Sequence, residues 1–181
     1  MAIQFTLRRV TRCYLFATLL CACFGGPVAH AEVYQTTEAW LAERLQTVPS
    51  PVVLWLTPEL RKQVTKILGH VPRTARYRYW RSDERTLWVL DEVGRTEDIT
   101  FGFDIAAGQI SHSKVLAFRE TRGWEIRAPW FTRQFDGARL TPELQLSQSV
   151  NAITGATLSV DAFRRSARLA LFLHQHVTAI K

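Results

Sequence analysis

Cysteine is scarce in this sequence and confined to one end. The 181 residues include three cysteines, and Cys13, Cys21 and Cys23 all stand within the first 31 positions. The remainder of the chain can therefore form no disulfide, thiolate metal site or haem-attachment motif. Histidines give no metal pattern either, because His174 and His176 stand two residues apart on a predicted helix and point in different directions.

Concentrated positive charge is also missing. The formal net charge is +7, but the arginines alternate with acidic residues such as Asp83, Glu84 and Asp91. Without a basic stripe, the sequence predicts no nucleic-acid binding. It has no nucleophile elbow and no acid–base motif, which disfavours a hydrolase. It has no internal repeat, and its length suits one domain.

Residues 1–31 have the three parts of an export signal. Three arginines, Arg8, Arg9 and Arg12, precede an apolar run at residues 14–24, and Ala29-His30-Ala31 is an A-x-A cleavage signal. The apolar run is too short to span a bilayer as a helix. Cleavage after Ala31 would leave 150 residues with a formal charge of +4. We therefore expect a signal peptide over residues 1–31 and a periplasmic protein.

A second processing route stays open. The stretch Leu20-Cys21-Ala22-Cys23 resembles a bacterial lipobox with Cys23 as the lipidated residue. This route would place the protein at the periplasmic face of the inner membrane, held by a lipid anchor.

Residues 32–73 are predicted to be an N-terminal helical segment. One short helix follows Thr36 and stops before Pro49. A clearer one has Thr57 at the N-cap, Pro58 at the first helical position and Gly69 at its end. We expect both to cover a sheet.

From Thr74 the apolar period changes from helical to alternating, and residues 74–181 are predicted to be the main domain. About four strands alternate apolar and polar residues up to Phe118, with turns between them. The pattern predicts an antiparallel meander with one apolar face. A long helix is expected after Ser159, so the fold class is α+β.

The stretch Thr154-Gly155-Ala156-Thr157-Leu158-Ser159 sits just ahead of this last helix. Gly155 can adopt a positive φ and let the backbone approach a ligand. Ser159 is a candidate N-cap, and Asp161 suits the positive end of the helix. Hydroxyl groups beside unpaired N–H groups at a helix start form a natural phosphate site.

A second stretch, residues 118–137, follows neither period. It contains Glu120-Thr121-Arg122-Gly123, and it ends in Gln134-Phe135-Asp136-Gly137.

Together the two stretches resemble the FMN-binding domain family, which includes the flavin-carrying subunits of bacterial sodium-pumping NADH:quinone reductases and Rnf-type complexes. The hydroxyl stretch resembles the family's Ser/Thr-Gly-Ala-Thr/Ser-any-Ser/Thr flavinylation motif. The earlier stretch resembles its Glu-Thr-Pro-Gly loop and Gln-Phe-any-Gly run, with Arg122 in the place of the proline. The usual upstream Asp is Asn151 here.

The resemblance implies that a transferase moves the FMN part of FAD onto Thr157 as a phosphoester. It also implies a flavin shuttle, rather than a stand-alone enzyme, with a membrane or periplasmic redox protein as partner. The implied cofactor site comprises the hydroxyl motif, with Thr154, Gly155, Ala156, Thr157 and Ser159, and the preceding loop, with Glu120, Thr121 and Gly123. For the flavin ring that the resemblance implies, the candidates to pack near it are Trp124, Trp130 and Phe131, and those to bond its polar edge are Glu120, Thr121 and Arg122. A threonine without an adjacent base is more readily modified by another enzyme than self-activated.

Two alternatives remain. The first is an exported domain that holds FMN or another small ligand noncovalently, which Asn151 favours. The second is a cofactor-free accessory protein of a membrane complex.

Overall fold

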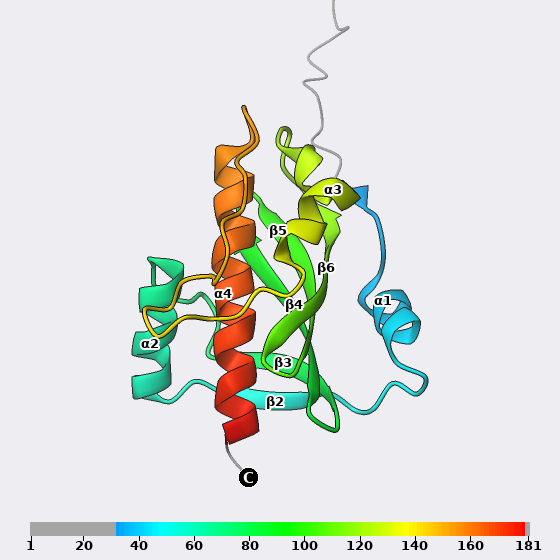
Figure 1. The fold of residues 1–181 in the computed structure, drawn as a ribbon, viewed down its shortest axis with the longest axis vertical. Coiled ribbons are helices and arrows are strands. Elements are labelled where there is room, and N and C mark those ends of the chain that lie inside the picture. Colours follow the sequence, from blue (N-terminus) through cyan, green and yellow to red (C-terminus); the bar gives the residue numbers. More distant parts are fainter. Residues whose placement is uncertain (1–31, 180–181) are drawn as a thin grey trace, which may run out of the picture.

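The computed structural model describes residues 32–179. The predicted signal peptide and the Cys23 lipidation site lie outside these residues. The described part contains a six-stranded sheet in the order β1-β6-β5-β4-β3-β2, and every neighbouring pair is antiparallel. Helices lie on both of its faces (Figure 1). The predicted α+β class is confirmed, with six strands rather than about four.

The elements follow a simple order along the chain. The strands are β1 (Glu32–Val33), β2 (Val52–Trp55), β3 (Arg76–Ser82), β4 (Arg85–Val93), β5 (Asp98–Ala106) and β6 (Gln109–Phe118). The helices are α1 (Thr37–Arg44), α2 (Pro58–Leu68), α3 (Pro129–Thr132) and α4 (Thr157–Ala179), with 3-10 turns η1 (Trp124–Arg127) and η2 (Arg133–Phe135). Residues 32–73 thus supply both edge strands as well as two helices.

Local capping places the N-terminal helices as expected. Thr36 and Thr57 accept bonds from the N–H groups of Ala39 and Leu60, each at 3.2 Å. Gly69 ends α2 with a φ of 79°. Helix α1 ends at Arg44, well before the proline that the sequence suggested as its stop.

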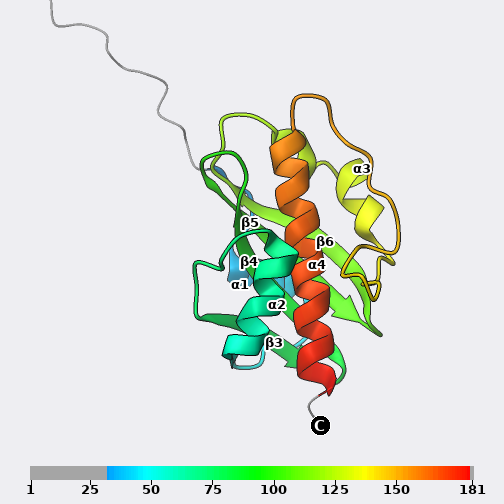
Figure 2. The same cartoon turned by 90° about the vertical axis from the view of Figure 1, so that its left-hand side faces the viewer.

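The main core lies between the sheet and the pair α2 and α4, which run side by side on one face (Figure 2). Phe163 of α4 is its centre, stacking on Phe135 at 4.3 Å and contacting Phe101 at 4.7 Å between ring centroids. Because Phe135 belongs to the segment between β6 and α4, this packing fixes that segment against the long helix.

Helix α1 covers only part of the opposite face. Trp40 is fully buried there, and its ring lies so close to Gly102 that a Cβ at that position would come within 2.8 Å. Asp104 is also fully buried on this face and pairs with Arg44 of α1 and with Arg85. A small apolar cluster and one buried carboxylate therefore hold α1 on the sheet.

Strand β3 leaves β4 halfway along its length. The two strands pair only from Tyr79↔Trp88 to Ser82↔Arg85, whereas β2 pairs with β3 from Arg76 to Tyr79. The second half of β4 therefore pairs with β5 on one side and, within residues 32–179, with no strand on the other. The sheet is split at this place.

None of the helices in the described range is both apolar enough and long enough to cross a bilayer.

Candidate functional site

The two sequence motifs meet at the N-terminal end of α4. Gly123, in the loop after β6, has a φ of 90°, and a Cβ there would lie 3.1 Å from the Cβ of Ser159 and closer still to its hydroxyl oxygen. Only glycine accommodates both this conformation and this contact. The loop therefore packs directly on the first turn of α4, and η1 continues along the same helix.

Thr157 is the first residue of α4, and its side chain is exposed. The first helical bond runs from the Val160 N–H to the Ala156 carbonyl at 2.9 Å. The N–H groups of residues 157–159 therefore have no partner within the helix, and they point out of its positive end. An anion attached at the Thr157 oxygen would lie against these donors.

The predicted N-cap is wrong. Ser159 lies inside the first turn and is buried, so the cap position falls to Ala156, which has no polar side chain. Asp161 lies beyond the first turn, where it pairs with Arg164 at 3.1 Å. Without a side-chain cap, the first-turn donors stay available to a ligand.

The remaining motif residues lie around Thr157. Thr154 and Gly155 are exposed, and Gly155 has a φ of 84° with no heavy atom within 4 Å of an added Cβ. Ala156 is buried and its N–H donates to the Ile153 carbonyl at 3.0 Å. The motif thus forms a tight turn at the surface, and Thr157 lies on its exposed side.

The carboxylate of Glu120 is occupied by the turn between β4 and β5. It accepts bonds from the N–H groups of Arg95, Thr96 and Glu97, the last two at 2.7 and 2.9 Å. Burial alone would raise the pKa of Glu120, but these three donors outweigh it and the pKa lies below its usual value. Glu120 therefore fastens the loop, while Thr121 and Arg122 beside it stay exposed.

The run Gln134-Phe135-Asp136-Gly137 contacts the chain just before the hydroxyl motif. The side-chain oxygen of Gln134 accepts a bond from the Asn151 N–H at 2.8 Å. Arg164 of α4 donates to the Val150 carbonyl. These two contacts bring residues 150–151 to a fixed place before the motif, and neither has a local sequence pattern that would have revealed it.

Only two of the three candidate aromatic residues are available to a ligand. Trp124 and Trp130 are 50% and 54% exposed, whereas Phe131 is fully buried against Phe135 and Phe163. Trp124 lies 5.2 Å from the Arg127 guanidinium, which also covers Tyr34 at 4.5 Å. Phe131 is therefore a core residue, and the exposed tryptophans are the surfaces on which a ring could stack.

Two of the histidines have structural partners. His174 is buried and its Nδ1 lies 2.7 Å from the Thr86 hydroxyl, while His70 lies 2.9 Å from Glu92. Across residues 32–179, no three ligating side chains gather in a metal-binding arrangement.

Two hollows of the surface contain no motif residue, although the second borders the motif through Val150 and Asp161. One, of about 720 Å³, opens at the split between β3 and β4, and the other, of about 430 Å³, is lined by Arg164, Arg165 and Arg168 of α4. Neither is lined by Thr157.

Comparison with known proteins decides the family. Residues 94–171 match the model of the FMN-binding domain. Residues 94–171 belong to the FMN-binding domain family. The match runs from the turn that holds Glu120 through most of α4, so it contains every candidate site residue. No curated protein and no solved structure matches the chain.

This FMN-binding domain offers groups that fit its ligand. Unpaired N–H groups at the start of α4 suit the phosphate, and the exposed indoles suit the ring system. The predicted family is therefore confirmed, and FMN binding is supported at the level of the domain.

Proposed function

We propose that Thr157 carries FMN as a phosphoester and that the protein is an exported electron carrier. The observation that carries the proposal is the exposed hydroxyl of Thr157 at the unpaired positive end of α4, within an FMN-binding domain. Bound FMN would supply the redox chemistry. The protein's residues would anchor the phosphate, shield one side of the ring and hold the loop that carries the motif.

Attachment would be made by a transferase that uses FAD. The Thr157 oxygen would form a bond to the phosphorus of the FMN half, the pyrophosphate bond of FAD would break, and AMP would leave while the hydroxyl proton is released. No side chain among residues 32–179 hydrogen-bonds the Thr157 hydroxyl, and Asp161, one turn further along the helix, pairs with Arg164. Among the described residues, therefore, no base bonds to this oxygen, which supports modification by a separate enzyme.

Export and location rest on the first 31 residues. The basic start, the short apolar run and Ala29-His30-Ala31 support a periplasmic protein, and Cys23 offers the alternative of a lipid anchor. A tethered flavin suits such a compartment because it cannot be lost by dilution. The partners we propose are the transferase and a membrane or periplasmic redox protein.

Noncovalent FMN binding is the second candidate, and Asn151 favours it because the usual acidic residue is missing. Intact mass spectrometry after co-expression with a flavin transferase separates the two. A denatured protein heavier by one FMN less one water supports attachment. An unmodified mass together with a yellow cofactor released on denaturation supports noncovalent binding.

A further inference from the structure

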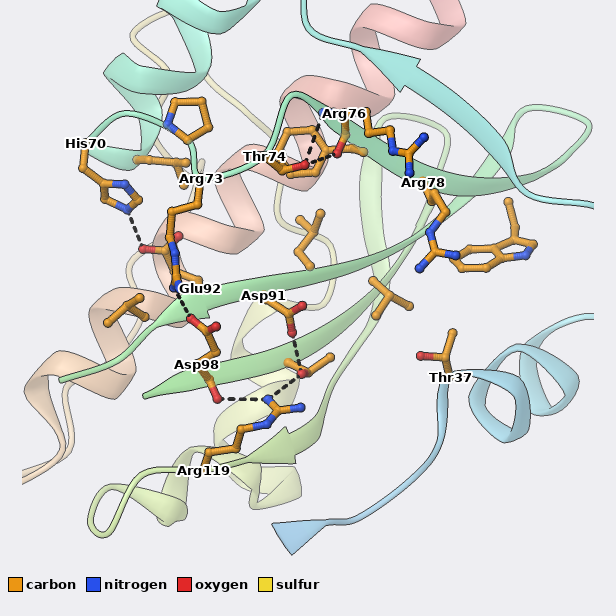
Figure 3. A pocket seen from close by; sticks show the side chains of 18 residues that line it. Thr37, His70, Arg73, Thr74, Arg76, Arg78, Asp91, Glu92, Asp98 and Arg119 are labelled. Atoms are coloured by element: carbon orange, nitrogen blue, oxygen red, sulfur yellow. Dashed lines mark hydrogen bonds and ion pairs between the residues drawn. The ribbon is translucent and has the colours of Figure 1, made fainter. Parts of the chain in front are cut away.

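The split in the sheet forms a hollow with an unusual distribution of charge (Figure 3). It borders α1, whose Thr37 lines it, and it reaches through the split to Leu68 of α2 and to Glu92, which bonds to Arg165 of α4. Its wall is formed by β3, the loop from His70 to Thr74, and the second half of β4. Its volume of about 720 Å³ lies within the range of about 300–1,000 Å³ found for ligand sites.

The acidic side chains of the hollow already have partners. Asp98 pairs with Arg73 at 2.6 Å, and Asp91 accepts a bond from the Thr100 hydroxyl at 2.6 Å. Glu92 is buried and bonds to both His70 and Arg165. Cations of the same region thus neutralise Asp98 and Glu92, whereas Asp91 is bonded only to a neutral hydroxyl and keeps its charge.

Arg76 and Arg78, by contrast, have no carboxylate within 4 Å in the described part of the chain. They alternate on β3 and therefore extend from the same face of the sheet (Figure 3). Arg76 lies 5.3 Å above the exposed ring of Trp55, which leaves its guanidinium at the surface. Two uncompensated cations thus stand at one side of the hollow.

The other side of the hollow is a free strand edge. Residues 89–92 of β4 pair with β5 only, so alternate N–H and C=O groups of this stretch point into the split. Such an edge binds an extended chain by adding a strand, and the side chains that flank it set the preference for the ligand.

We propose that this split is the docking site for an extended, acidic segment of a protein partner. The segment would pair along residues 89–92, and its carboxylates would meet Arg76 and Arg78. The basic start of the chain itself, with Arg8, Arg9 and Arg12, has the wrong charge for this place. A second copy of the chain is also disfavoured, because pairing two copies about a two-fold axis would bring arginines of like charge together.

The proposed docking site is independent of flavin attachment, although it adjoins the candidate flavin loop, since Arg119 of the hollow directly precedes Glu120. Its test therefore uses the full processed chain without flavin. Loss of peptide binding would leave the flavin proposal standing, and an unmodified Thr157 would leave the docking proposal standing.

The test measures binding of a labelled peptide of about eight residues that alternates Glu and Val, at about 50 mM salt. A peptide with Lys in place of Glu is the probe control. The variant Arg76→Gln/Arg78→Gln is compared with Lys62→Gln/Lys66→Gln, which removes the same charge from exposed positions of α2 on the opposite face. Backbone amide shifts and hydrogen exchange report on residues 89–92.

We expect the Glu peptide to bind, to protect amides within residues 89–92, and to bind about tenfold more weakly to the arginine variant but not to the lysine variant. Equal binding of the Lys peptide, unchanged amides at residues 89–92, or an arginine variant that binds as well as the lysine variant would overturn the proposal. So would displacement of the peptide by millimolar inorganic phosphate alone, since this would indicate a simple anion site. A dimer seen by sedimentation that the arginine variant disperses would assign the surface to a second copy and overturn it as well.

Discussion

Replacing Gly123 with alanine tests whether the loop and the long helix meet as described. The new Cβ would adopt a φ of 90° and would lie 3.1 Å from the Cβ of Ser159 and closer to its oxygen. A left-handed conformation costs a non-glycine residue about 1–2 kcal/mol. Forcing an extra carbon into a packed contact costs about 1–3 kcal/mol more.

Gly137→Ala is the matched control for this prediction. Gly137 has a similar φ of 80°, but nothing lies within 4 Å of an added Cβ. It therefore reports the conformational cost alone, and the difference between the two variants isolates the contact. We expect Gly123→Ala to be less stable than Gly137→Ala by about 1–3 kcal/mol.

Urea unfolding followed by tryptophan fluorescence measures this difference, and the thermal midpoints should differ by about 2–12 °C for a domain of this size. Adding Ser159→Ala to Gly123→Ala should recover part of the loss, because it removes the closest atom. Equal stability of the two glycine variants, with no gain from Ser159→Ala, would refute the packing of the loop on α4.

The remaining predictions concern the groups that hold the site and the sheet. Glu120→Gln should make the free energy of unfolding depend less on pH in the acid range. The pKa of Glu120 is lowered in the folded protein, so the stability that its carboxylate contributes is present above the unfolded pKa and is lost as the pH falls through the folded pKa. Urea titrations between neutral and acid pH check this, and the same pH dependence of the free energy of unfolding in wild type and variant would contradict it. Trp40→Ala should cost about 3–5 kcal/mol in the same assay because Trp40 is fully buried on Gly102, whereas Trp55→Ala, at a side chain that is 61% exposed, should cost less than about 1 kcal/mol. Similar losses for both tryptophans would show that α1 does not pack as described.

Sequence patterns predicted the helices and strands that are determined by residues within the element itself. Helix α2 was predicted from Thr57, Pro58 and Gly69, which act within the helix itself. The four long strands were predicted from their alternation. Strands β1 and β2 were not, since stretches of two and four residues show no period and depend on the sheet edges that they join.

The residues of the candidate site were named from sequence motifs and stay a prediction, whereas the contacts around them depend on the fold. The motif predicted Thr157 as the attachment site, but Ser159 predicted too late a start for α4. Residues 150–151, just before the motif, are held by Gln134 and Arg164 from other parts of the chain. The part that Glu120 plays depends on a turn more than twenty residues earlier. Phe131 resembles its neighbour Trp130 in sequence, and only the packing around Phe163 separates a core ring from a surface ring.

The most direct test of the account is to locate the flavin on the chain. Wild type, Thr157→Ala, Thr157→Ser and Thr154→Ala would each be co-expressed with a flavin transferase, denatured, and examined by in-gel flavin fluorescence and by mass mapping of the peptide that contains residues 151–164. Thr154 is the matched control, since it is an exposed threonine of the same motif. We predict a flavin signal in wild type, Thr157→Ser and Thr154→Ala, and none in Thr157→Ala. A flavin that persists in Thr157→Ala, or its absence from folded wild-type protein, would contradict the account.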